Sequence, residues 1–343
     1  MSVNCLRISV TDRCNQRCVY CRPRGDGDFL ARAQILRAEE ILRLVRLFAE
    51  CGIDRVRLTG GEPLVRRDVI PLVAGLAGAD GIREVALTTN GVLLEAMAAD
   101  LKAAGLSRVN VSLDSLHARS YGRITGRENL SQVLRGVRRA LAVGLQPVKI
   151  NAVILRRLNA SQILDLAALS LDLPVIVRFI EYCPTSCRTE PAEGYMPYAE
   201  IRGIVENTFG RLTETVVVPG NGPAAYFQID RGARDPWPGS GDLWPVARDP
   251  RHGSRGTGYG IIGFIAGRSM VFCSSCNRLR LTSDGLIKPC LYSARPYDVK
   301  ALLREGASDD RIRALLRAII AQKAGLSRLN ASREDFCMRK VGG

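Results

Sequence analysis

The chain has 343 residues, of which 46% are hydrophobic and 24% are charged, and these proportions suit a folded protein with one large core. They argue against a disordered chain, and no run of eighteen or more apolar residues predicts a transmembrane helix. The net charge of +15 is compatible with an anionic partner such as a nucleotide or an RNA. Arginine is spread along the whole chain, so the charge alone does not choose between them.

The chain contains eleven cysteines and only two histidines. An odd cysteine count, behind an N-terminus that lacks the apolar core of a signal peptide, argues against a disulfide framework and predicts a cytoplasmic location. Clustered thiols in a reducing compartment indicate bound metal instead. Two imidazoles give little support to a mechanism that needs several.

The first 180 residues alternate strand-like and helix-like segments. Strands rich in Val, Ile and Leu, as buried parallel strands should be, are predicted at Leu6–Val10, Arg55–Thr59, Glu84–Thr88, Arg108–Leu113, Val148–Ile154 and Val175–Ile180. Helices are predicted at Ala38–Glu50, Asp68–Leu76, Glu95–Ala104, Ser131–Val143 and Ser161–Leu171. These six repeats predict an α/β fold, an incomplete (β/α)6 barrel whose chemistry lies at the C-terminal ends of the strands.

The composition changes between Pro219 and Gly260, where the density of Gly and Pro predicts a long irregular loop. Beyond it, a strand is predicted at Ile261–Ala266, and helices at Tyr297–Glu305 and Arg311–Lys323. We therefore expect three regions: a barrel core at 1–182, a connecting segment at 183–260 and a C-terminal region at 261–343.

The strongest motif is Cys14-x3-Cys18-x2-Cys21, directly after the first predicted strand. Three thiolates on a tight loop can hold three irons of a [4Fe–4S] cluster and leave the fourth iron open to another ligand. Structural zinc normally takes four ligands, and no fourth lies nearby in the sequence. Three buried free cysteines are the plainer alternative, but they rarely occur at this density beside polar residues.

A second motif, Thr59-Gly60-Gly61-Glu62-Pro63, follows the second predicted strand. Paired glycines let the backbone approach a ligand closely, and the Glu62 carboxylate could accept a hydrogen bond from an ammonium group. Taken alone, the motif is an ordinary turn at the end of a strand.

A third motif is Cys273-x2-Cys276-x13-Cys290, which indicates a second cluster with an open iron. A zinc knuckle is the alternative, although its fourth ligand is missing. Between these cysteines, Arg278 and Arg280 lie on one face of an extended segment, where they could clamp a phosphate. A solvated strand is the usual meaning of such a pair.

The segment from Thr11 to Cys21 resembles the signature of the radical S-adenosylmethionine (SAM) family. The resemblance implies that the open iron binds the amino and carboxylate groups of SAM, and that Tyr20 contacts its adenine. It also implies that Gly61 and Glu62, and then Ser112 near the end of the fourth strand, contact SAM.

From Cys5 to the C-terminus, the chain is similar to the GTP 3′,8-cyclase family of molybdenum cofactor biosynthesis. The segments that carry this resemblance are Leu6–Ser9, Arg57–Pro63, Thr88–Gly91, Val109–Ser115, Val148–Asn151, Arg178–Tyr182, Cys276–Thr282 and the terminal Gly342-Gly343. It implies a radical SAM barrel with a C-terminal cluster-binding extension, two [4Fe–4S] clusters and SAM. The implied reaction converts GTP to (8S)-3′,8-cyclo-7,8-dihydroguanosine 5′-triphosphate through a 5′-deoxyadenosyl radical.

The resemblance also implies roles for individual residues. GTP would be bound by Arg7, Arg57, Thr88, Lys149, Arg278 and Arg280. Cys183 would contact SAM, although the family usually has Met at that position. The terminal pair, Gly342 and Gly343, is implicated in the cyclisation. Cys183 and Cys187 form a spare C-x3-C pair, for which a further metal site is possible and free thiols are the simpler reading.

The same resemblance implies an external electron donor and a downstream cyclic pyranopterin monophosphate synthase as partners, with no nucleic acid or membrane, and a monomer or a homodimer. Two alternatives stay open on sequence. One is a radical SAM enzyme that modifies RNA or a peptide, which the positive charge allows. The other is a non-catalytic interaction module built around zinc or a cluster.

Overall fold

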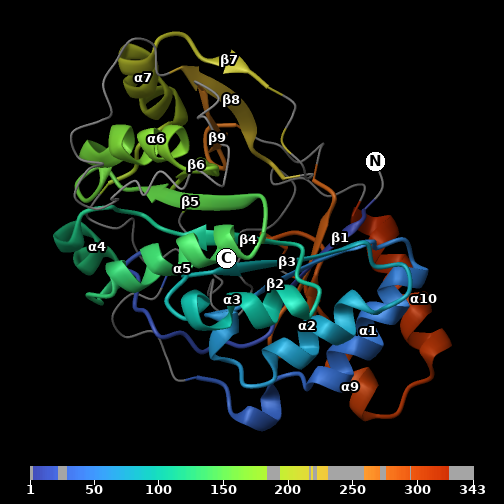
Figure 1. Ribbon diagram of the computed structural model, residues 1–343. Helices are drawn as coiled ribbons and strands as arrows, with labels where there is room; N and C mark the ends of the chain where they lie inside the picture. Colours follow the sequence, from blue (N-terminus) through green and yellow to red (C-terminus); the bar gives the residue numbers. More distant parts are fainter. Residues whose placement is uncertain are drawn as a thin grey trace.

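The structure is a computed structural model that describes residues 3–21, 29–183, 194–215, 218, 222–230, 259–270, 276–293 and 295–323. Within these ranges, twelve strands form one open sheet in the order β12-β11-β10-β1-β2-β3-β4-β5-β6-β9-β8-β7 (Figure 1). The parallel centre consists of β1 (Cys5–Ser9), β2 (Arg55–Thr59), β3 (Glu84–Thr89), β4 (Arg108–Ser112), β5 (Val148–Ile154) and β6 (Val175–Glu181). The incomplete barrel is therefore confirmed, since each of the six predicted strands is present and the sheet does not close.

Helices connect the parallel strands in the βα pattern that the sequence predicts. Their bounds are α1 (Ala38–Glu50), α2 (Val69–Ala77), α3 (Leu94–Ala103), α4 (Ala118–Thr125), α5 (Leu130–Ala142), α6 (Ile163–Asp172), α7 (Tyr198–Phe209), α9 (Val299–Arg304) and α10 (Asp309–Lys323). Helices α4 and α7 were not predicted. None of the helices in the described ranges has the length and apolar character needed to cross a bilayer.

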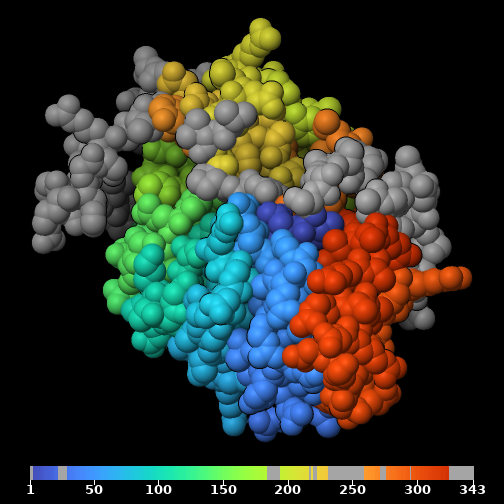
Figure 2. All heavy atoms as spheres, turned by 90° about the vertical axis from the view of Figure 1, so that its right-hand side faces the viewer, coloured from blue at the N-terminus to red at the C-terminus, as the bar shows by residue number. Residues whose placement is uncertain are grey.

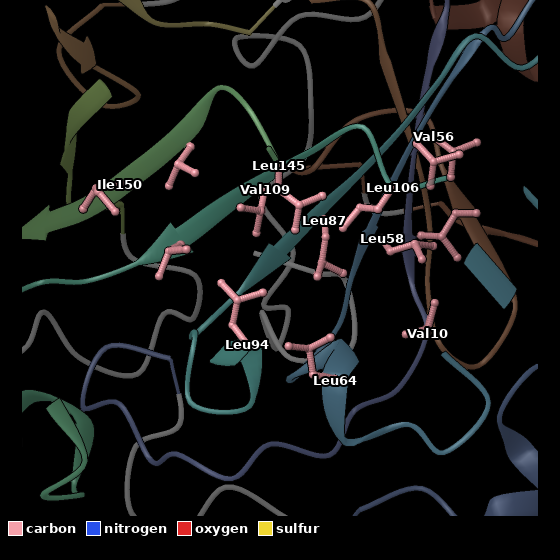
Figure 3. Close-up of a cluster of buried hydrophobic side chains, with 14 of the residues drawn as sticks. Val10, Val56, Leu58, Leu64, Leu87, Leu94, Leu106, Val109, Leu145 and Ile150 are labelled. Atoms are coloured by element: carbon pink, nitrogen blue, oxygen red, sulfur yellow. The ribbon is translucent and has the colours of Figure 1, made fainter. Parts of the chain in front are cut away.

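The main core lies between the central strands and these helices. Every second strand residue, such as Val56, Leu58 and Leu87, points to the helix-covered face, where each is fully buried (Figure 3). Helix α1 contributes Ile41, Leu44, Val45 and Phe48 from the single face that the sequence predicts. Burying one such side chain stabilises the fold by roughly 1.5–3 kcal/mol.

The prediction of an irregular loop from Pro219 to Gly260 is wrong in part. Within this segment β8 (Ala225–Asp230) pairs antiparallel with β9 (Tyr259–Ile265), and the Phe227 and Phe264 rings pack 5.7 Å apart. The density of Gly and Pro obscured a short strand, which an aromatic pair and a main-chain ladder stabilise. β8 also pairs with β7 (Thr213–Glu214). Residues 231–258, with Trp237 and Trp244, lie outside the described residues.

The C-terminal region extends the other edge of the same sheet. β10 (Arg278–Leu281) runs parallel to β1, and β11 (Leu286–Lys288) and β12 (Tyr297–Asp298) continue outward. Figure 2 shows the C-terminal helices (red) against the N-terminal part of the chain (blue). The helix predicted from Tyr297 begins two residues later, because Asp298 caps α9 by accepting a hydrogen bond from the Ala301 amide at 2.8 Å.

Candidate active site

The cysteine loop that follows β1 is fixed by the glycine turn that follows β2. The Gly61 amide donates to the Thr11 carbonyl at 2.7 Å, and the Glu62 amide donates to the Arg13 carbonyl at 2.8 Å. A Cβ atom at Gly61 would lie 2.3 Å from the Arg13 oxygen, and one at Gly60, where φ is +155°, would lie 2.5 Å from the Thr11 oxygen. Only glycine permits this close approach. The second motif therefore positions the first.

Glu62 lies behind this turn, with only 1% of its surface exposed. Its carboxylate accepts from the Leu64 amide at 3.0 Å, the Thr89 hydroxyl at 2.7 Å and the Asn90 amide at 2.7 Å. Burial raises the pKa of Glu62 to about 7, although these hydrogen bonds oppose the rise. Glu62 thus ties the end of β2 to the end of β3. Its contact with a ligand ammonium stays a prediction.

The three thiols of the first motif lie on the short loop that follows β1. Cys14 Sγ accepts from the Gln16 amide at 3.4 Å and from Asn90 Nδ2 at 3.8 Å. Burial raises the pKa of Cys18, and the nearby Asp114, Cys21 and Cys14 raise it further.

This thiol set fits a cluster better than a single ion. Among the residues that the structure describes, no three His, Cys, Asp or Glu side chains converge closely enough to hold one metal ion. A [4Fe–4S] cluster places each thiolate on a different iron, so its ligands need not converge on one point. Three sulfur donors on one short loop match that requirement.

Tyr20 connects the cysteine loop to the end of β4. Its hydroxyl donates to Asp114 Oδ2 at 2.6 Å, and Asp114 Oδ1 accepts from the Val153 amide at 2.8 Å. Burial raises the pKa of Asp114 to about 6, against the effect of these two hydrogen bonds. The structure thus brings Tyr20 close to the strand end that carries Ser112, as the sequence predicts for residues of one site.

The face of the sheet opposite the main core carries a row of cations. Strand residues alternate between faces, so Arg7 points away from the core that Leu6 and Ile8 enter. The register places Arg7 beside Arg57 on β2 and beside Arg280 on β10. The cations that the strands place on this polar face are Arg7, Arg55, Arg57, Arg108, Lys149, Arg178, Arg278, Arg280 and Lys288.

The positive charges on this face favour the binding of an anion. Burial, and then Arg108, lower the pKa of Arg57 to about 10, while burial and the neighbouring Arg178 lower that of Lys149 to about 6. Arg57 Nε, Arg178 Nε and two nitrogens of Arg108 have no hydrogen-bond acceptor among the described residues. Buried donors are rarely left unsatisfied in a folded protein, so a further acceptor, such as a bound anion, is expected at these nitrogens.

Thr88 and Lys149 occupy the same polar face. Thr88 Oγ1 accepts from Asn110 Nδ2 at 3.3 Å, and Lys149 Nζ donates to Tyr226 Oη at 3.3 Å. All six predicted GTP contacts are therefore on one face. The sequence interpretation did not single out Arg108, whose Nη2 donates to Glu84 Oε1 at 2.7 Å on the same face; the signal was its place at the start of a strand with polar residues at every second position.

The two described cysteines of the second motif, Cys276 and Cys290, precede and follow β10 in the chain. Cys276 Sγ accepts from Lys323 Nζ at 3.4 Å and from Arg278 Nη2 at 3.8 Å. Burial would raise the pKa of Cys276, but these two cations outweigh it and lower the pKa to about 7. Cys276 and Cys290 both interact electrostatically with Arg280.

Other predicted residues are placed separately or not at all. Cys183 follows β6, and its Sγ lies 3.0 Å from where a Gly267 Cβ would be. Cys187, Cys273, Gly342 and Gly343 lie outside the described residues.

Two family models match different parts of the chain. The Radical SAM superfamily model matches residues 8–169, and the Molybdenum Cofactor Synthesis C model matches residues 248–327. The first covers the cysteine loop and the glycine turn, and the second covers the cysteines on either side of β10.

Known proteins match over nearly the whole length. The GTP 3′,8-cyclase of Moorella thermoacetica is 42% identical over 99% of this chain and 98% of the relative, and that of Gloeobacter violaceus is 44% identical over 94% and 92%. Streptococcus suis SuiB bound to the precursor peptide SuiA shares the fold, with a TM-score of 0.50 and 20% identity, over 60% of this chain and 45% of SuiB. The chain belongs to the GTP 3′,8-cyclase family of the radical SAM superfamily.

Proposed function

We propose that this chain is a radical SAM enzyme that converts GTP to (8S)-3′,8-cyclo-7,8-dihydroguanosine 5′-triphosphate, the first step of molybdenum cofactor biosynthesis. The observation that supports this most directly is the cation row beside the cysteine loop. A triphosphate carries several negative charges and many acceptor oxygens, which suit buried guanidinium groups such as Arg57 and Arg178, whose Nε atoms have no partner among the described residues.

The N-terminal cysteines would hold the first cluster. Cys14, Cys18 and Cys21 supply three sulfur ligands, and the fourth iron would bind SAM. When bound, that cluster supplies the electron that cleaves SAM into methionine and a 5′-deoxyadenosyl radical. Around this pocket, Tyr20, Gly61, Glu62, Ser112 and Cys183 would bind and orient SAM. The hydrogen bond from Tyr20 to Asp114 supports this grouping, since it holds the aromatic ring beside the strand ends.

The polar face of the sheet would orient the nucleotide. Arg7, Arg57, Arg278 and Arg280 lie on neighbouring strands, so one extended triphosphate could contact several of them at once. Thr88 and Lys149 lie further along the sheet and would contact the same substrate. Fixing the ribose beside the reactive carbon of SAM, with water excluded, is the protein's main contribution to the reaction.

A second [4Fe–4S] cluster would be held by Cys273, Cys276 and Cys290. The two described thiols of this group adjoin Arg280, which supports a cluster beside the substrate rather than at a remote surface. The open iron of that cluster would bind the guanine end of GTP. Gly342 and Gly343 would hold the substrate or its radical during cyclisation.

The remaining assignments are proposals of the same kind. The two electrons that the reaction consumes would come from an external donor, and cyclic pyranopterin monophosphate synthase would use the product. We further propose a cytoplasmic location, a monomer or homodimer, and a division into 1–182, 183–260 and 261–343. The interactions of β10 with β1 would join the last region to the first through one continuous sheet.

The test is anaerobic reconstitution with iron and sulfide, followed by incubation with SAM, a reductant and GTP deuterated at C3′. We expect 5′-deoxyadenosine that has acquired deuterium, and a nucleotide product that has lost it and contains a new ring. GTP deuterated at C2′ is the matched control and should transfer none. Cleavage of SAM without deuterium transfer, in the presence of GTP, would contradict the proposed substrate.

A further inference from the structure

Lys323 is a buried cation that does not belong to the row of cations on the polar face of the sheet. It is the last residue of α10, and only 6% of it is exposed. Lysine is among the residues least often buried, because its charge loses the solvation of water. Its ammonium donates to Cys276 Sγ at 3.4 Å, across 47 positions of sequence.

Lys323 occupies a position in the helix where an apolar residue would be expected. The buried residues of α10 are Ile312, Leu316, Ile319 and Lys323, which follow one another at spacings of four, three and four. Lys323 therefore continues the apolar stripe that packs α10 onto the fold, where a leucine or isoleucine would be expected. The lysine stem can fill the apolar position while its head reaches the sulfur. Its place in the last helical turn also favours a cation.

The cysteine that it contacts differs from the thiols of the first motif. Cys276 receives two charged donors, Lys323 and Arg278. Cys14 receives donors from an amide backbone and an asparagine side chain, both neutral. Hydrogen bonds to the sulfurs of an iron–sulfur cluster, and positive charge beside it, stabilise the more negative reduced state and raise the reduction potential.

We propose that Lys323 is a positioning residue of the C-terminal cluster, which donates a hydrogen bond to Cys276 Sγ and offsets the negative charge of the cluster, so that the cluster is retained and its reduction potential is raised. This inference rests on the proposed function, because it needs the cluster held by Cys273, Cys276 and Cys290. It adds a residue on α10 to a site whose other members lie on and beside β10.

The test measures the C-terminal cluster alone. In a chain with Cys14, Cys18 and Cys21 replaced by alanine, only that cluster remains, and an anaerobic redox titration followed by electron paramagnetic resonance gives its midpoint potential. Lys323→Met keeps the length of the side chain but removes the donor and the charge, whereas Lys323→Arg keeps both. Lys102→Met removes an exposed lysine of α3, whose Nζ donates to the Gly144 carbonyl, and serves as the matched control.

We expect the potential to fall in Lys323→Met, with the Lys323→Arg and Lys102→Met chains close to the parent. Loss of the cluster in Lys323→Met while Lys323→Arg retains it would also support the proposal. An unchanged potential with full iron content in Lys323→Met would overturn it, as would equal loss of iron in the Met and Arg variants, because packing would then be the only role. A parent chain without any second cluster would instead refute the two-cluster proposal, and this inference with it.

Discussion

Cys18 of the first cysteine group and Cys276 of the second have thiol pKa values that are shifted in opposite directions. Burial, and then Asp114, raise the pKa of Cys18. Cys276 lies beside cations, and Arg278 and Lys323 lower its pKa to about 7. Two cysteine groups of different spacing thus differ in their resolved hydrogen-bond donors, which are neutral at Cys14 and cationic at Cys276.

This contrast suggests a division of work. An electron donor that must cleave SAM benefits from a cluster of low potential, and the hydrogen-bond donors resolved at Cys14 are neutral. A cluster that is proposed to hold an anionic nucleotide would benefit from nearby cations, and both Arg278 and Arg280 interact with Cys276. The difference follows from position, because β10 brings its own arginines next to the cysteines that precede and follow it.

Replacing each cysteine group in turn should have the largest effect, because it separates the proposed roles of the two groups. Replacing Cys14, Cys18 and Cys21 with alanine should abolish SAM cleavage and lower the iron content from about eight to about four per chain, if both clusters hold four irons. Replacing Cys273, Cys276 and Cys290 should lower the iron content by the same amount. SAM cleavage should continue, but GTP should no longer be cyclised. Iron analysis and chromatography of 5′-deoxyadenosine measure both. Cleavage that survives the first replacement would show that the roles are reversed.

Gly61→Ala should disturb the first group and leave the second intact. The new methyl group would overlap the Arg13 carbonyl oxygen, which is fixed backbone, so we expect a loss of about 3 kcal/mol in stability, at the upper end of overpacking costs. Iron at the N-terminal cluster should fall, as measured by spectroscopy of chains that lack one or the other cysteine group. Gly203→Ala, in α7 with no atom within 4 Å of the added Cβ, is the control and should keep full iron content.

Arg280→Ala should separate nucleotide binding from SAM binding. Losing a charged hydrogen bond costs roughly 1.5–3 kcal/mol, which corresponds to about a ten- to hundredfold loss of affinity for GTP. Affinity for SAM should be nearly unchanged, because Arg280 lies on β10, at the second cysteine group. Calorimetric titration of both ligands measures this, and Arg119→Ala on the exposed face of α4 is the control. An equal loss for both ligands would indicate a folding defect instead.

The smallest effect concerns protons taken up with GTP. Burial and neighbouring arginines lower the pKa of Lys149 to about 6, so the free protein holds it neutral at about pH 8. A bound triphosphate raises that pKa by favouring the ammonium form, so binding takes up a proton and weakens as pH rises. Above about pH 8 the nucleotide's own phosphates hold few protons that could mask this uptake. Calorimetry in buffers of different ionisation enthalpy should detect the uptake, and Lys149→Met should abolish it.

The sequence predicts the positions of the strands and helices better than it predicts which residues lie on each face of the sheet. Runs of Val, Ile and Leu locate the six central strands, and the prediction that these strands are buried holds on the polar face too, where Arg108, Lys149 and Arg178 are buried. In Leu6-Arg7-Ile8 and Val56-Arg57-Leu58, apolar and basic residues alternate, with the apolar ones at 0% exposure. That alternation predicts one apolar face and one polar face that carries cations, including Arg108 and Arg178.

Contacts between distant segments could not be read from local patterns. The cysteine and glycine motifs were recognised, but nothing in the sequence predicts that the backbones of Thr11 and Gly61 meet. The contact of Lys323 with Cys276 is of the same kind, because the helical pattern places Lys323 on the buried face without naming its neighbour. The strand at Ala225–Asp230 was missed because its partner, β9, lies beyond a long Gly- and Pro-rich segment.

The pairing of β10 with β1 also has a consequence for synthesis of the chain. Asn277 and Asn4, which are hydrogen-bonded at the start of these strands, are 273 positions apart, so one edge of β1 has no partner until nearly all of the protein has left the ribosome. At about 5–20 residues per second, that interval is on the order of tens of seconds. An open strand edge can pair with another chain during this time. Truncated or slowly translated chains should therefore aggregate through β1, and expression that slows initiation should improve the yield.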